Sequence, residues 1–281
     1  MRGGKGALVK PSILSRRRSR PAAPAPLPPH PPVHGPWPED SFRDAAAQVV
    51  SFFRDEGIDL AGTRLADIGC GDGVMDLGVF QQARPSLLVG FDLAPVDTAT
   101  LAARAAHQGV ATDLPDGLRF ETCGPDHLPV PDHTFDHIFS WSAFEHILQP
   151  VAVLKDVRRV LRPGGTLMIQ LWPFYHSKHG SHLWDWFPEG FGQLLHDPFE
   201  VERRVLAEPE KGPGWTNELL GAFRELNRIT LDDLHRALLH TGFEVVKLEL
   251  LSECMHIPPE LAHLPLSLLA ISGVKLLAVP K

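Results

Sequence analysis

Apolar residues occur along the chain in short continuous runs bounded by turn residues, which is typical of buried strands. We expect strands at 65–68, 87–91, 118–120, 135–141, 166–171, 243–250 and 274–279. Between these runs, apolar positions three or four residues apart predict helices at 41–56, 74–83, 96–107, 153–161 and 231–238. This alternation predicts an α/β fold with a doubly wound, mostly parallel, seven-stranded sheet that binds its ligands at the carboxyl ends of the strands.

The first 38 residues have a different composition from the rest of the chain. They hold seven basic residues and no acidic one, and ten of the 27 prolines lie within the first forty residues. Such a segment cannot bury enough apolar surface to offset the entropy lost on ordering. We therefore expect residues 1–38 to be a disordered Pro- and Arg-rich tail, and residues 39–281 to form one folded domain.

Charge and cysteine content narrow the possible partners. The chain has 27 basic and 34 acidic residues, and residues 39–281 hold all 34 acids but only 20 of the bases. Nucleic-acid affinity depends on Lys and Arg contacts, so we expect no nucleic-acid partner. Three scattered cysteines suit a reducing cytoplasm. The most apolar late segment is interrupted by His263, Pro265, Gly273 and Lys275, so we expect no transmembrane span and no membrane partner.

Three glycines follow the first predicted strand: Gly69, Gly71 and Gly73. A glycine-rich turn between a strand and a helix lets a ligand lie against bare backbone and exposes amide groups at the helix N-terminus. A dinucleotide fingerprint needs a third glycine one residue later, where Val74 stands. An ordinary tight turn is the alternative reading of the same residues.

Two acidic residues frame these glycines. Asp67 precedes them on the same strand, and Asp92 ends the next strand, where a carboxylate can accept hydrogen bonds from both hydroxyls of a ribose. The pair indicates a cofactor that contains a nucleoside.

With these residues the sequence resembles the class I, Rossmann-like S-adenosylmethionine-dependent methyltransferases. The resemblance covers roughly residues 60–172, with four segments in the order and spacing of that family. They are Leu65-Ala66-Asp67-Ile68-Gly69-Cys70-Gly71-Asp72-Gly73, Asp92, Leu128-Pro129-Val130-Pro131-Asp132 with Phe135-Asp136, and Arg159-Val160-Leu161-Arg162-Pro163-Gly164-Gly165.

The resemblance implies S-adenosylmethionine as cofactor and assigns roles to individual residues. Asp67, Gly69 and Gly71 are expected to line its methionine end, and Asp92 is expected to hold its ribose. The family usually has an aspartate at the place of Gly124 to meet the adenine amino group, and here Asp126 is the substitute. The resemblance also places Ser140 and Trp141 beside the sulfonium.

The residues after the fourth strand bear on what is methylated. Enzymes that methylate nucleobase amino groups carry an Asn/Asp-Pro-Pro-aromatic motif where this chain has residues 140–143, and no cysteine lies at this edge for a cytosine-C5 mechanism. Glu145 and His146 follow and could supply a general base. The alternative is that they cap and orient the next helix.

A long segment, 172–229, follows the fifth strand. Within 20 residues it holds seven of the chain's 22 aromatic residues: Trp172, Phe174, Tyr175, Trp184, Trp186, Phe187 and Phe191. We expect it to fold over the cofactor as a cap that forms the acceptor pocket. The alternative is that the aromatics form only a small core of the cap.

The same segment holds three histidines three residues apart, His176, His179 and His182. Such spacing could bind a metal on a helical turn, but Gly180 interrupts it and no acidic residue follows until Asp185. We therefore predict no metal site.

Residues 172–177 and 180–184 resemble a segment of bacterial methyltransferases of glycan or secondary-metabolite pathways. The resemblance implies methyl transfer to a hydroxyl oxygen of a small-molecule or glycan acceptor, with His146, His182 and Tyr175 as the catalytic residues. Two alternatives stay open: an NAD-type oxidoreductase, and a catalytically silent cofactor-binding module. The sequence predicts no oligomeric state.

Overall fold

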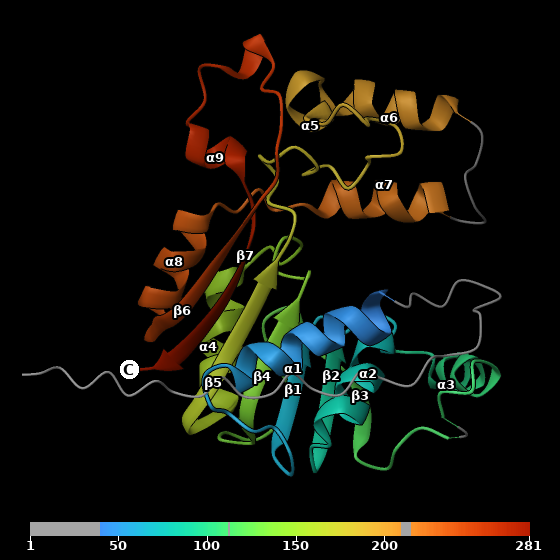
Figure 1. Ribbon diagram of the computed structural model, residues 1–281, viewed down its shortest axis with the longest axis vertical. Helices are drawn as coiled ribbons and strands as arrows, with labels where there is room; N and C mark the ends of the chain where they lie inside the picture. The colour runs from blue at the N-terminus through green and yellow to red at the C-terminus, as the bar shows by residue number, and fades with distance from the viewer. Residues whose placement is uncertain (1–39, 112, 209–214) are drawn as a thin grey trace, which may run out of the picture.

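A computed structural model describes residues 40–111, 113–208 and 215–281 of the protein (Figure 1). Within these residues one seven-stranded sheet has the order β3-β2-β1-β4-β5-β7-β6. Its strands are β1 (Arg64–Ile68), β2 (Leu87–Asp92), β3 (Leu118–Thr122), β4 (Phe135–Trp141), β5 (Leu161–Leu171), β6 (Phe243–Ser252) and β7 (Ile271–Pro280). Only β7 runs antiparallel to its neighbours, so the predicted mostly parallel α/β sheet is confirmed.

Helices lie on both faces of the sheet and at its end. They are η1 (Asp40–Ala45), α1 (Ala46–Arg54), α2 (Val74–Ala83), α3 (Thr98–His107), α4 (Pro150–Val160), α5 (Gly192–Leu195), α6 (Pro198–Ala207), α7 (Trp215–Glu225), α8 (Leu231–His240), η2 (Pro259–Leu261) and α9 (Leu266–Ala270). Local sequence explains where several begin. The Asp97 carboxylate caps α3 by accepting from the Thr100 amide, and Thr230 and Asp233 form a reciprocal capping box at α8.

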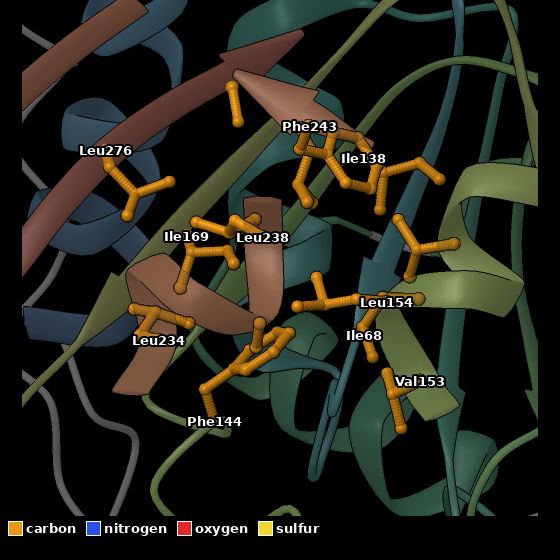
Figure 2. Packing of buried hydrophobic residues seen from close by; sticks show 14 of the residues in the cluster. Ile68, Ile138, Phe144, Val153, Leu154, Ile169, Leu234, Leu238, Phe243 and Leu276 are labelled. Atoms are coloured by element: carbon orange, nitrogen blue, oxygen red, sulfur yellow. The ribbon is translucent and has the colours of Figure 1, made fainter. Parts of the chain in front are cut away.

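The core divides into two apolar layers because neighbouring strand residues point to opposite faces. One layer packs α1, α2 and α3 against residues such as Leu65, Leu88 and Phe139. The other packs α4 and α8 against the intervening positions, and Figure 2 shows Phe144 beside Leu234 and Leu238 in this second layer. The central strands such as β1 and β2 are therefore buried on both faces, which explains why they read as continuous apolar runs, whereas the edge strands β3 and β6 are largely exposed.

Several predicted boundaries differ from the structure by up to three residues, and two differ in kind. The first helix begins with a π-helical stretch, Asp40–Ala45, before the α-helix Ala46–Arg54, and nothing in the sequence explains this start. Strand β5 begins at Leu161 rather than at Thr166, because Leu161 pairs with Phe135 before the register shifts to Thr166 and His137. Gly164, with φ +81°, and Gly165 lie in this bulge, between the predicted helix and the predicted strand.

Residues 172–230 connect β5 to α8 and carry α5, α6 and α7. In Figure 1 these helices lie beyond the end of the sheet toward which the β5 arrow points. They surround an apolar cluster of their own, which consists of Tyr175, Leu183, Trp186, Phe187, Val201, Val205, Leu220, Phe223 and Leu226. The predicted disordered tail, residues 1–38, lies outside the described residues. Within the described part of the chain, no helix combines the length and apolarity that crossing a membrane requires.

Candidate active site

The glycine-rich turn after β1 is held against the end of β2. The amides of Gly69 and Cys70 donate to the Phe91 carbonyl oxygen at 2.8 and 3.1 Å, and Gly69, Gly71 and Gly73 all have positive φ. The Gly71 amide donates to an Asp92 carboxylate oxygen at 2.9 Å. The structure therefore brings the two predicted cofactor residues Gly71 and Asp92 into direct contact.

The glycines serve different purposes. A Cβ atom added at Gly69 would lie 2.4 Å from the Cβ of Ala143, in the turn after β4. At Gly71 nothing lies within 4 Å of the same position. Gly69 thus permits close packing of two turns, whereas Gly71 leaves an open face on which a ligand can approach the backbone.

Asp67, the third predicted residue of this region, is fully buried and lies beside a second buried acid, Asp76, from α2. Burial is the main cause that raises the pKa of both carboxyl groups, and the proximity of the Asp76 carboxyl raises the pKa of Asp67 further. All four carboxylate oxygens are buried, and the hydrogen bond between the two carboxyl groups leaves most of their acceptor positions unfilled by the described residues. Buried carboxyl groups of this kind suit a cationic or amine-bearing ligand, which would supply the missing donors.

Sequence reasoning missed Asp76. Its neighbours Val74, Leu77 and Val79 are buried as well, so α2 has almost no polar face that would mark an acid on it as unusual. The only available signal was the position of Asp76 in the first turn of the helix that follows the glycines.

The predicted residues at the end of β4 lie next to β1. The Ser140 hydroxyl donates to the Ile68 carbonyl oxygen at 2.7 Å, so this side chain hydrogen-bonds β4 to β1. Trp141 is half-buried, and Asp126 is exposed between β3 and β4. Their contacts with adenine or sulfonium stay predictions.

Arg159 of α4 fixes the loop that leads into β4. Its guanidinium donates to the carbonyl oxygens of Val130 and Leu128 at 2.8 and 2.9 Å, and it pairs with Asp156 and Asp132. This explains physically why the segments 128–132 and 159–165 occur together: one arginine binds the backbone of the other segment.

A second group of polar side chains gathers at the turn after β4. Glu145, His146 and His182 each offer a ligand atom, and these atoms all lie within 4.8 Å of one another. We call these three residues the Glu145 cluster. The rings of His146 and His182 have their centroids 5.3 Å apart. The structure therefore brings together the two histidines that the sequence analysis proposed as catalytic, of which His146 precedes β5 in the chain and His182 follows it.

Burial sets the charge of the Glu145 cluster. It raises the pKa of Glu145 to about 8 and lowers the pKa of His182 to about 4, with the nearby His146 lowering the latter further. The pKa of His146 is also lowered by burial. At neutral pH the cluster is therefore uncharged, with imidazole nitrogens available to accept a proton.

The other predicted residues of the segment 172–229 lie apart from this cluster. His179 pairs with Glu253 at 3.2 Å, and the His176 ring packs edge-on against Tyr175. The histidine triplet is therefore not assembled, and His182 groups with Glu145 and His146 instead. The buried Tyr175 hydroxyl donates to the Gln193 carbonyl oxygen at 3.3 Å, and its catalytic role stays a prediction.

The segment that contains most of the candidate site is similar to known methyltransferases. Residues 66–169 match the family model described as a methyltransferase domain. The 27-O-demethylrifamycin SV methyltransferase of Amycolatopsis mediterranei is 28% identical over 48% of this chain and 49% of its own. The solved structure of a geranyl diphosphate methyltransferase in complex with SAM is 16% identical, with a TM-score of 0.52 over 84% of this chain and 85% of that chain. The resemblance to class I, Rossmann-like methyltransferases is confirmed.

Two further findings bear on substrates. The chain spans about half the length of the curated relatives it matches. One of them is the tRNA U34 carboxymethyltransferase of Sulfurovum sp., 27% identical over 48% of this chain and 45% of its own. The exclusion of nucleic acid on the basis of acidic composition is therefore not supported, because relatives of this domain act on tRNA.

Proposed function

We propose that this protein transfers a methyl group from S-adenosylmethionine to a hydroxyl oxygen of a small-molecule or glycan acceptor. The observation that carries the proposal is the meeting of Asp67, Gly71 and Asp92 at the carboxyl ends of β1 and β2, within a segment that matches a methyltransferase domain. Three unpaired cysteines, Cys70, Cys123 and Cys254, suit a reducing compartment such as the cytoplasm.

The residues present fit S-adenosylmethionine. The buried Asp67 carboxyl group has acceptor positions that its neighbour Asp76 does not fill, so a ligand that carries an ammonium group would satisfy them. The open position beside Gly71 permits backbone contact, and Asp92 stands at the end of β2 where a ribose is held in related sheets. Asp67, Gly69 and Gly71 would hold the methionine end, and Asp92 the ribose.

The cofactor supplies an electron-poor methyl group to the acceptor oxygen. The chain's own part is to align the acceptor, to exclude water and to take the hydroxyl proton. We assign proton acceptance to the Nδ1 atom of His146, which is buried without a hydrogen-bond partner. His182 is the weaker base because its pKa is near 4, so it serves to position the acceptor or His146.

We propose the segment 172–229 as the cap over this edge. Its Trp172 and Trp184 rings lie 6.1 Å apart, and the Trp184 ring lies 6.3 Å from that of His182. Aromatic faces beside polar groups suit the C–H faces and hydroxyls of a sugar ring or a polyhydroxylated small molecule. Trp186 and Phe187 belong instead to the buried apolar cluster of the same segment. We therefore propose that Trp172 and Trp184 contact the acceptor, whereas Trp186 and Phe187 form the core of the cap.

The proposal is tested by incubating the purified protein with methyl-labelled S-adenosylmethionine and fractionated small molecules and glycans. We expect label in an acceptor as an O-methyl group. Thermal shift provides the parallel readout: S-adenosylmethionine and its demethylated product should raise the melting temperature, and NAD should not. Stabilisation by NAD alone would support the oxidoreductase alternative, and cofactor binding without labelled product from any fraction would support the silent module.

A further inference from the structure

The Glu145 cluster is built from two segments that meet only in the folded chain. Glu145 and His146 lie in the turn after β4, and His182 comes from the segment after β5. Their ligand atoms lie within 4.8 Å of one another. Ligands around one metal ion at bond lengths of about 2.0–2.2 Å are separated by roughly 3–4 Å, so a small closure of these side chains would suffice.

We propose that Glu145, His146 and His182 bind a divalent transition-metal ion such as Zn²⁺. The inference deepens the proposed function, because it gives a ligand to the same site. Two imidazoles and one carboxylate are the donor set that Zn²⁺ and the later first-row metals accept, whereas Mg²⁺ and Ca²⁺ prefer oxygen alone.

The hydrogen-bonding state of the cluster supports a ligand. Both Glu145 carboxylate oxygens, His146 Nδ1 and His182 Nε2 are buried without a hydrogen-bond partner among the described residues. Native proteins rarely leave so many buried polar atoms unpaired in one place, because each costs free energy. One bound metal ion would satisfy an atom of all three side chains.

The backbone that carries these side chains is held by hydrogen bonds. The Asn227 side-chain amide donates to the carbonyl oxygens of Phe144 and Ile147, both at 2.7 Å. The Asn227 backbone amide donates to the Glu145 carbonyl oxygen at 2.8 Å. The turn that presents Glu145 and His146 is therefore clamped on both sides, as a preorganised metal site requires.

His182 is held in an uncommon backbone conformation, with φ +62°. A non-glycine residue in this region is strained, and such strain concentrates at functional sites. Its ring centroid lies 5.3 Å from that of His146 and 6.3 Å from that of Trp184. The strained backbone thus serves to direct the His182 side chain toward the other two members of the cluster.

Three protein ligands leave a coordination position free, which distinguishes a catalytic from a structural zinc site. An oxygen ligand fits that position, and a metal ion lowers the pKa of a bound hydroxyl or water. With metal bound, an acceptor hydroxyl would release its proton to solvent, and His146 would act as a ligand rather than as the base.

The test uses the full chain, stripped of metal by a chelator and titrated with Zn²⁺ in a calorimeter. We expect the parent to bind one equivalent that is lost or weakened at least about 100-fold in each of the variants Glu145→Gln, His146→Gln and His182→Gln. The control variants His176→Gln and His179→Gln should bind within about threefold of the parent, since these residues lie outside the cluster.

Equal losses in the controls, or no stoichiometric binding by the parent, would overturn the inference. If a cluster variant does not fold, anomalous scattering from zinc-soaked crystals of the parent decides: a peak among the three side chains supports the site, and zinc only elsewhere refutes it. S-adenosylmethionine binding, measured without metal, separates the two proposals. If the parent binds this cofactor but no zinc, only the metal site is refuted. If it binds zinc but not the cofactor, the proposed function is refuted.

Discussion

The imidazole rings of His146 and His182 lie 5.3 Å apart, although helix α4 and strand β5 separate the two residues along the chain. His146 belongs to the turn after β4, which pairs with the Asp67 strand β1, and the Asp92 strand β2 lies on the other side of β1. His182 belongs to the segment that leaves the sheet after β5. The pair thus joins the proposed cofactor edge to the proposed cap.

The substitution His182→Gln should separate catalysis from cofactor binding. We expect methyl transfer to fall at least about 100-fold, because His182 positions the acceptor or His146 and a small misplacement of reacting groups can cost that much. S-adenosylmethionine affinity should stay within a few-fold, because Asp67, Gly71 and Asp92 are untouched. Turnover and calorimetric affinity are measured on the same preparation, with the exposed His240→Gln as control. Normal turnover in His182→Gln would remove this residue from the mechanism.

Glycine substitutions test the close packing of the turns after β1 and β4. Gly69→Ala and Gly71→Ala carry a similar backbone penalty, because both positions have positive φ. Only the first places a Cβ atom against Ala143, at 2.4 Å. We expect Gly69→Ala to lower the free energy of unfolding by about 1–3 kcal/mol more than Gly71→Ala does. Equal effects in chemical denaturation would contradict this packing.

The pKa shifts of Asp67 and Asp76 predict how stability depends on pH. Both folded-state pKa values lie above the unfolded value of 3.8, so the folded protein binds more protons than the unfolded chain as pH rises past about 4. Their contribution to the free energy of unfolding is present at lower pH and is lost with rising pH.

Asp76→Asn removes one of the coupled acids, and its amide can donate to Asp67. We therefore expect this variant to gain stability over the parent between about pH 5 and about pH 7, measured by urea unfolding without cofactor. The exposed Asp116→Asn is the control and should follow the parent. A parallel pH dependence in Asp76→Asn and the parent would show that the pair is not coupled.

The central strands were predictable from sequence because burial on both sheet faces gives continuous apolar runs, as at 87–91. The proximity of Gly71 to Asp92 in the candidate site was predictable, because a local motif places both residues at the ends of consecutive strands. Contacts between distant segments were not. Helical spacing grouped His182 with His176 and His179, whereas the positive φ at His182 and the path of the segment place it beside His146.

Arg159 provides a test of the loop that leads into β4. Lysine cannot reproduce the forked contacts to the carbonyls of Leu128 and Val130 and to Asp156, so these partly buried acceptors would lose donors. We expect Arg159→Lys to lower the free energy of unfolding by about 1–3 kcal/mol. The neighbouring Arg158→Lys loses one contact, at 3.5 Å to Lys281, and should cost much less. Equal melting temperatures for the two variants would contradict this account.

The contact between Gly71 and Asp92 lies at the edge of the sheet that we propose binds S-adenosylmethionine. Asp92→Ala removes the acceptor proposed for two ribose hydroxyls and the partner of the Gly71 amide. Each hydrogen bond to a charged group contributes roughly 1.5–3 kcal/mol, so affinity should fall at least about tenfold. Asp116→Ala removes an exposed acid outside this edge and is the charge-matched control.

Calorimetric titration of the full chain with S-adenosylmethionine is the most direct measurement. We expect binding by the parent and by Asp116→Ala, with affinity at least about tenfold weaker in folded Asp92→Ala. Unchanged affinity in folded Asp92→Ala, or no binding by the parent, would contradict it.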